Sequence, residues 1–261
     1  MEPMSNCSSG SGGWVCADAA AIMQAVESQT LILYHTDLRG QWPAAAARAL
    51  AARLPYGKRL ALGADGPQQH ASLAGIALAL RALGALLDRA VSPGELVFTR
   101  GEKPRLARAS PGTPHGAIAA QAPSAGEVAT AEEAATADPA TSADKASAAR
   151  DPGADFSISH SGPWVGCAAL GCGRVGFDVE MGDGEQIASW VAREAALKAW
   201  GAGIRALREL SSSAEGIRCG GVLWFARALP IFPGASACVM TSRAARGLCA
   251  RALSLEELFG R

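Results

Sequence analysis

Two carboxylates stand two residues apart in a stretch of strand-forming residues, Asp178 and Glu180 in the segment VGFDVE at residues 175–180. Side chains of a strand alternate between its two faces, so both carboxylates project from one face and Val175, Phe177 and Val179 from the other. Neighbouring carboxylates repel each other unless a cation lies between them, and their hard oxygen atoms suit Mg²⁺ or Mn²⁺ better than Zn²⁺. The segment predicts a divalent-cation site, with an exposed polar strand face as the alternative.

A third carboxylate follows in a run of helix-forming residues at 190–200. Glu194 and Lys198 are four residues apart and therefore lie on one stripe of the expected helix, with Ser189 placed as its N-cap. The same spacing also suits an ordinary surface ion pair worth about 0.3–0.5 kcal/mol, which is the alternative interpretation. The position of this helix just after the paired carboxylates favours a shared site.

Hydroxyl and imidazole groups occur together in the segment FSISHSG at residues 156–162. Its alternating apolar residues predict a strand that ends in a turn, where Ser159, His160 and backbone N–H groups are exposed to an anion. A single histidine after a strand is more often a structural hydrogen-bonding group, so that alternative stays open for His160.

The ordered set SHS, then G-x-D-x-E, then W-x-x-[KR]-E-A-x-x-K resembles the 4′-phosphopantetheinyl transferase superfamily, in particular its larger, surfactin-type branch. Four further segments agree with that branch in order. They are residues 102–106, which resemble its GKPRL element, 72–75, which resemble an N-terminal helix motif, 235–240, which resemble a late strand, and 254–258, which resemble its terminal S-x-E-E-L. The resemblance covers most of the chain apart from its N-terminal segment and a middle insert.

The resemblance implies transfer of the 4′-phosphopantetheine arm from coenzyme A to a serine of an acyl, peptidyl or aryl carrier protein, releasing adenosine 3′,5′-bisphosphate. It implies Mg²⁺, with Mn²⁺ as the alternative, held by Asp178, Glu180 and Glu194. The cation would bridge phosphate oxygens while the serine attacks the β-phosphorus. Glu194 is also the candidate to take the serine proton, and Lys198 would hold a phosphate oxygen.

The remaining site residues are assigned from the resemblance alone. Ser159 and His160 are expected to contact the phosphates of coenzyme A, and His160 is counted among the catalytic residues. Lys103 and Pro104 are expected to bind coenzyme A, with the Lys103 ammonium on the 3′-phosphate and Pro104 restricting the local backbone. Without the resemblance, Lys103 would be interpreted as a solvated lysine. The chain departs from the pattern at residues 181–189, a short segment where part of the wall that meets the carrier protein is expected to be missing.

The expected fold class is α+β. The resemblance implies two similar α/β halves that form a pseudo-dimeric 4′-phosphopantetheinyl transferase fold with a cleft between them. Residues 14–106 are expected to form the N-terminal half, and residues 156–261 the C-terminal half with the metal and catalytic motifs. Residues 107–155 are rich in Ala, Pro, Ser and Thr and lack large apolar residues, which predicts a mostly disordered low-complexity insert or linker.

The apolar periodicity and the turn residues also predict individual elements. Helices are expected at residues 42–54, 72–87, 189–200 and 254–258. Strands are expected at residues 31–35, 96–99, 156–159, 164–170, 175–180, 221–228 and 235–241.

Composition agrees with a soluble enzyme. Of 261 residues, 49% are hydrophobic, which suffices for a sizeable core. The 24 basic residues equal the 24 acidic ones, so no bias toward nucleic acid or a membrane is expected. The seven cysteines contain no C-x-x-C pair and are expected to be reduced. No signal peptide and no apolar run long enough to cross a bilayer are expected, which favours a cytoplasmic location.

Analogy with the surfactin-type branch favours a monomer that serves secondary metabolism. Two other functions remain open from the sequence. The same carboxylates could support a magnesium-dependent phosphodiesterase in which water is the nucleophile. A non-catalytic descendant could still bind coenzyme A or a carrier domain, although such a protein would have no need for a costly cluster of charge.

Overall fold

The computed structural model describes residues 30–63, 65–99, 102–107, 153–213 and 215–260. Its helices are α2 (Ala44–Arg53), α3 (Tyr56–Ala61), α4 (Pro67–Leu87), α5 (Glu185–Trp200) and α6 (Leu255–Phe259), with the 3₁₀ turns η1 (Pro93–Glu95) and η3 (Ile204–Glu209). Its strands are β1 (Thr30–Asp37), β2 (Leu96–Val97), β3 (Arg105–Leu106), β4 (Asp155–Ser161), β5 (Trp164–Leu170), β6 (Val175–Met181), β7 (Ser211–Ser213), β8 (Gly216–Cys219), β9 (Val222–Ala228), β10 (Ala235–Thr241) and β11 (Gly247–Ala252).

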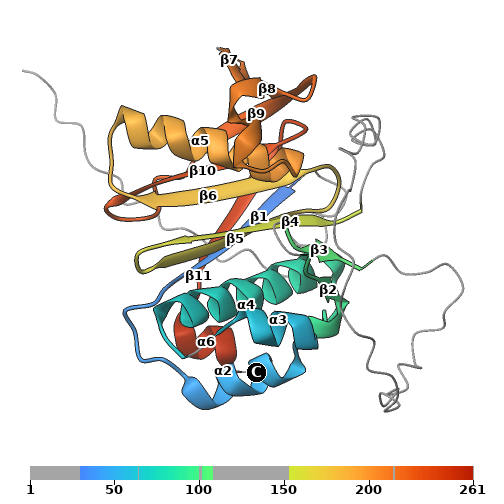
Figure 1. The fold of residues 1–261 in the computed structure, drawn as a ribbon, viewed down its shortest axis with the longest axis vertical. Coiled ribbons are helices and arrows are strands. Elements are labelled where there is room, and N and C mark those ends of the chain that lie inside the picture. The colour runs from blue at the N-terminus through green and yellow to red at the C-terminus, as the bar shows by residue number, and fades with distance from the viewer. Residues whose placement is uncertain (1–29, 64, 100–101, 108–152, 214, 261) are drawn as a thin grey trace, which may run out of the picture.

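The chain has an α+β fold, as expected, built on two main sheets (Figure 1). The four-stranded sheet has the order β11-β1-β5-β4, and the five-stranded sheet has the order β6-β10-β9-β8-β7. The β11 strand runs parallel to β1, whereas β5 pairs with β1 and β4 in antiparallel register. A separate hairpin is formed by β2 and β3.

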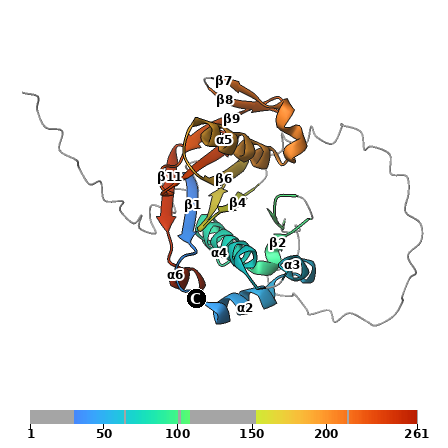
Figure 2. The same ribbon diagram turned by 60° about the vertical axis from the view of Figure 1, so that its left-hand side comes forward.

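The two sheets pack face to face and each carries a helix on its outer face (Figures 1 and 2). The core between the sheets contains Leu31 and Leu33 from β1, and Phe177 and Val179 from β6. On the other side of the four-stranded sheet, α4 packs against β1, β4 and β5 and is contacted by α2 and α6. On the other side of the five-stranded sheet, α5 packs against β6 and β10. The layers therefore follow the order helix, sheet, sheet, helix.

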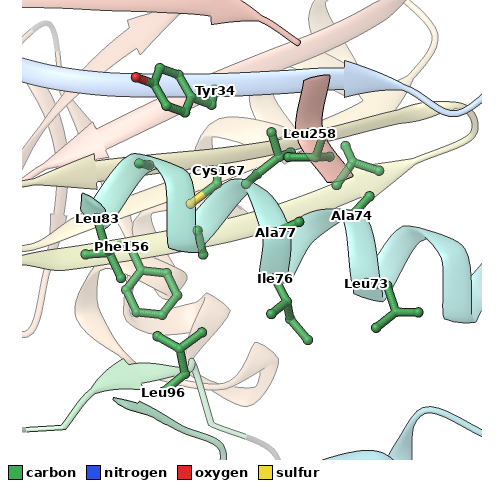
Figure 3. Close-up of a cluster of buried hydrophobic side chains, with 14 of the residues drawn as sticks. Tyr34, Leu73, Ala74, Ile76, Ala77, Leu83, Leu96, Phe156, Cys167 and Leu258 are labelled. Atoms are coloured by element: carbon green, nitrogen blue, oxygen red, sulfur yellow. The ribbon is translucent and has the colours of Figure 1, made fainter. Parts of the chain in front are cut away.

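The long apolar helix α4 corrects one expectation. By length and composition alone it could cross a membrane, so the expectation that no such run exists is wrong. Most of its apolar surface is buried inside the protein, because its residues pack onto the four-stranded sheet. Figure 3 shows Ile76, Ala77 and Leu83 of α4 among the core side chains, which include Phe156 of β4. In this structure α4 is a core helix.

Several predicted elements differ in their bounds. The helix α4 begins at Pro67, earlier than residue 72, with the proline at its first position, where a missing N–H costs nothing. The helix α5 begins at Glu185, so the expected N-cap Ser189 lies inside it and Gly184 holds the cap position. An acidic residue in the first turn is favoured by the helix dipole, which the sequence interpretation overlooked.

The short elements α3, β3, β7, β8 and β11 were not predicted, because their sequences lack a clear apolar period. The capping box at Ser254 is confirmed, since its hydroxyl accepts from the Glu257 amide. The five described cysteines are free thiols. Cys7, Cys16 and residues 108–152 of the expected insert lie outside the described residues. The strand β4 begins at Asp155, the last residue of the expected insert.

His35 provides a test of the core between the sheets. It lies against Phe232 with ring centroids 5.0 Å apart, and burial lowers the pKa of His35. Above about pH 6.5 the residue is neutral in both the folded and unfolded chain, whereas below that pH the unfolded chain binds the proton more readily. Stability should therefore fall as the pH drops below about 6.5, down to the lower pKa of the folded protein.

We expect His35→Gln to lose less thermal stability than the parent protein between pH 7.5 and 5.5. The measurement is the melting temperature of both proteins at the two pH values. Comparing the two differences isolates His35, because every other titrating group is present in both proteins. Equal losses in the two proteins would show that His35 does not contribute to the acid sensitivity.

Candidate metal and phosphate site

The candidate site lies at the seam between the two sheets. The strand β4 is an edge strand of the four-stranded sheet, and β6 is an edge strand of the five-stranded sheet. The two edge strands lie next to each other (Figure 1). No β-ladder joins them within the described part of the chain. Side chains bridge them instead. Asp155 accepts a hydrogen bond from the Val175 amide at 2.8 Å, and the Ser161 hydroxyl accepts one from the Met181 amide at 3.1 Å.

The three predicted metal ligands come together at this seam. Asp178 and Glu180 project from the same face of β6, because the alternating residues Phe177 and Val179 turn into the core between the sheets. Glu194 joins them from α5, and one carboxylate oxygen of each residue lies within 4.8 Å of the others. Asp178 is 1% exposed, whereas Glu180 and Glu194 are partly buried. Three carboxylates this close together match the oxygen ligand set of Mg²⁺ or Mn²⁺.

A close approach of α5 to β6 sets the position of Glu194. Gly176 of β6 lies beneath α5, and a Cβ atom there would overlap the carbonyl oxygen of Ala195 and the amide nitrogen of Ala199. Glycine therefore lets the helix backbone rest directly on the strand. Ala195 directly follows Glu194, and Ala199 directly follows Lys198. The contact with Gly176 therefore fixes the helix backbone next to both functional side chains.

Asp178 is held on one side only. Its Oδ1 accepts hydrogen bonds from the Lys198 ammonium at 2.6 Å and from the Ser159 hydroxyl at 2.7 Å. The Lys198 ammonium also donates to Ser159 Oγ at 3.0 Å. The other oxygen, Oδ2, is buried and has no hydrogen-bond partner among the described residues. Such an orphaned acceptor costs about 1–3 kcal/mol or more when charged, so a cation bound there would fit the site.

The surroundings of Glu194 disfavour its ionised form. Burial raises the pKa of Glu194, and the charge of Asp178 raises it further, against the opposing effect of Lys198. A bound cation would reverse this balance, because it favours the ionised carboxylate.

His160 lies beside the carboxylates and not among them. It is exposed and, by strand alternation, turns to the face of β4 opposite Ser159 and Ser161. Although the side chain is exposed in part, partial desolvation of its ring and the nearby Lys198 ammonium lower the pKa of His160. Its ring therefore loses its proton at a lower pH than an ordinary imidazole, and it points away from the strand face that carries Ser159 and Ser161.

Lys103 lies elsewhere along the seam, and the interpretation as a solvated lysine is wrong. Its ammonium donates to Asp155 Oδ2 at 2.6 Å and to the Val175 carbonyl oxygen at 2.6 Å. Both side chains of the ion pair are 11% exposed. Burial lowers the pKa of Lys103 while Asp155 opposes that effect, and the short ion pair indicates the charged form.

A pocket of about 620 Å³ opens next to this ion pair. Its charged lining residues are Glu102, Lys103, Arg105, Asp155 and Arg174. Pro104 is not among the lining residues. The pocket therefore offers cationic groups to a ligand, although Lys103 is already engaged by Asp155.

Sequence reasoning did not identify the seam contacts of four residues, namely Asp155, Ser161, Arg174 and Gly176. Arg174 donates to the carbonyl oxygens of Ala199 and Trp200, at 3.3 and 3.1 Å, and so binds the end of α5. For Ser161 a signal was present, since Ser159 and Ser161 are two residues apart and must share a strand face. The other three depend on contacts between distant segments.

Comparisons of the chain with protein-family models and with curated proteins find no match. The function of the site is therefore inferred from its motifs and its geometry.

The buried ion pair predicts a large effect on stability. We expect Lys103→Met to lower the free energy of unfolding by about 3–5 kcal/mol, because it leaves the Asp155 carboxylate buried without its charged partner. Urea or thermal unfolding measures this loss. Arg105→Met is the control, since its ion pair with Glu102 is exposed and is expected to contribute about 0–1 kcal/mol. A stable Lys103→Met protein with weakened coenzyme A binding would instead indicate that Lys103 is a ligand only.

Proposed function

We propose that the protein transfers the 4′-phosphopantetheine group of coenzyme A to a serine of an acyl or peptidyl carrier protein. The observation that supports this most directly is the cluster of Asp178, Glu180 and Glu194, with the Lys198 ammonium beside it. Within this cluster the buried Oδ2 of Asp178 has no partner in the described parts of the chain. The order of the motifs that carry these residues resembles the transferase superfamily, which favours this reaction over other phosphate chemistry.

In the proposed reaction the serine oxygen forms a bond to the β-phosphorus of coenzyme A. The bond from that phosphorus to the bridging oxygen breaks, and adenosine 3′,5′-bisphosphate leaves with the electron pair. Mg²⁺, or Mn²⁺ in its place, would offset the negative charge on the pyrophosphate when held by the three carboxylates. Glu194 accepts the serine proton, directly or through a water molecule.

The protein's own residues orient the phosphates. Lys198 uses two of its donors on Asp178 and Ser159, which leaves a third N–H for a phosphate oxygen. Ser159 is held between these two groups at the end of β4. From the opposite face of β4, His160 would offer its imidazole to a second phosphate group of coenzyme A.

The pocket beside Lys103 suits the nucleotide end of coenzyme A. It lies at the start of β6, where Val175 contacts Lys103, three residues before Asp178. Three strand residues span roughly 10 Å, a separation comparable with that between the pyrophosphate and the far side of an adenosine unit. Arg105 and Arg174 would contribute positive charge toward the 3′-phosphate.

The same proposal includes the finer expectations about fold and setting. It implies that the α+β architecture is the pseudo-dimeric fold of the superfamily, with two similar halves. It also implies a monomer that acts on carrier domains of secondary metabolism. The expected location is the cytoplasm, where coenzyme A is available.

Intact-protein mass spectrometry tests the proposal. Apo acyl and peptidyl carrier proteins are incubated with the protein, coenzyme A and Mg²⁺, alongside Glu194→Gln. A carrier mass gain of one phosphopantetheine arm, lost with the variant, is the expected result. Hydrolysis of coenzyme A without carrier modification would favour a phosphodiesterase. Binding of coenzyme A without either reaction would favour a non-catalytic protein.

A further inference from the structure

The last residue of β4, Ser161, makes two hydrogen bonds across the seam. Its Oγ lies 2.8 Å from Oε2 of Glu180 and 3.1 Å from the amide nitrogen of Met181. It therefore contacts one of the three clustered carboxylates and the backbone of the next residue. The contact with Glu180 differs from the sequence interpretation, in which the hydroxyls of this segment are exposed to an anion.

The two contacts fix the direction of the hydroxyl proton. The Met181 amide can only donate, so it must bond to a lone pair of Ser161 Oγ. An ionised Glu180 carboxylate can only accept, so the single hydroxyl proton must point to its Oε2. The serine thus has one arrangement that satisfies both neighbours.

This arrangement restrains a side chain that is otherwise free to move. Asp178 is short, buried and held by Lys198, whereas Glu180 has a longer side chain and is only partly buried. Within the described part of the chain, the hydrogen bond from Ser161 is the one hydrogen bond to the Glu180 carboxylate. A hydrogen bond that holds Oε2 also sets the direction of the other carboxylate oxygen of Glu180. Hydrogen-bond partners of metal-binding carboxylates orient their ligands in the same way.

We propose that Ser161 is a positioning residue that orients Glu180 for divalent-cation binding. This rests on the proposed function only in that the three carboxylates bind a cation, and not on the transfer reaction. The expected consequence is a weaker cation affinity without Ser161, by about 10- to 100-fold.

The test is Mn²⁺ binding to the full chain without coenzyme A or carrier protein, measured by electron paramagnetic resonance of free Mn²⁺. Ser161→Ala is expected to bind Mn²⁺ about 10- to 100-fold more weakly than the parent protein. Ser161→Thr, which keeps the hydroxyl, should restore most of the affinity. Ser157→Ala is the matched control, because Ser157 lies on the same strand face and its buried hydroxyl has no partner in the described residues.

A double-mutant cycle separates positioning from a general structural effect. In a Glu180→Ala background, Ser161→Ala should cause no further loss of Mn²⁺ affinity if it acts through Glu180. If Ser161→Ala does not fold, Ser161→Cys gives the same comparison, since a thiol keeps the volume but donates weakly. Unchanged Mn²⁺ affinity in the folded variants, an equal loss in the Glu180→Ala background, or no Mn²⁺ binding by the parent would each overturn the proposal. Weakened Mn²⁺ binding in a protein that modifies no carrier would support the role of Ser161 while the transferase proposal fails.

Discussion

Asp178→Asn should lower carrier-protein modification by about 10³-fold while leaving the protein folded. The substitution keeps the shape of the side chain and removes the charge of the most buried of the three carboxylates. Oδ2 of Asp178 is buried and has no hydrogen-bond partner among the described residues. In the asparagine this position holds either a neutral amide oxygen, which is a weaker cation ligand, or an NH₂ group, which is not a ligand. The rate is measured by the appearance of modified carrier, with Glu194→Gln as a second variant at the same cluster.

The stability of Asp178→Asn distinguishes a functional carboxylate from a structural one. Removing one of three carboxylates within 4.8 Å relieves repulsion, and Lys198 can turn to solvent because its side chain is 28% exposed. We therefore expect a melting temperature equal to or above that of the parent when no divalent cation is added. Added Mg²⁺ should raise the melting temperature of the parent more than that of the variant. A variant that unfolds, or that transfers at the parental rate, would contradict this account of Asp178.

Gly176→Ala should both destabilise the protein and abolish the site. The added methyl group would overlap two backbone atoms of α5, the Ala195 carbonyl oxygen and the Ala199 amide nitrogen. Backbone atoms of a helix cannot turn aside as a flexible side chain can, so α5 must move away from β6. The expected cost is about 3 kcal/mol, which corresponds to roughly 6–12 °C in melting temperature for a chain of this size. Displacement of α5 also separates Glu194 from the carboxylates of β6.

Thermal unfolding and Mn²⁺ binding check this prediction together. Gly203→Ala is the matched control because it lies just after α5, has a φ of −80°, and would place its Cβ in open space. The control is expected to be as stable as the parent and to bind Mn²⁺ equally well. A Gly176→Ala protein with parental stability and affinity would mean that the close packing of α5 on β6 does not determine the site.

Local periodicity was sufficient to identify which residues share a face. The two-residue spacing placed Asp178 and Glu180 together on β6, and the four-residue spacing placed Glu194 and Lys198 together on α5. Most of the longer elements also followed from apolar patterns and capping residues, and they agree with the α+β class that the resemblance implies. These features depend on backbone geometry within a few residues, which the sequence specifies directly.

Only the tertiary structure decided how these faces meet. The strands β4 and β6 are edge strands of two different sheets that lie side by side. No repeat or periodicity in the sequence indicates that they are neighbours. Lys103 was expected on a phosphate, yet it pairs with Asp155, 52 residues away and inside the expected insert. Gly176 carries no chemical group of its own, and it matters because α5 returns to lie on it. The sequence by itself thus determined the residue types and the faces on which they lie. Packing between distant segments decided which of them form one site, because such contacts depend on the fold as a whole.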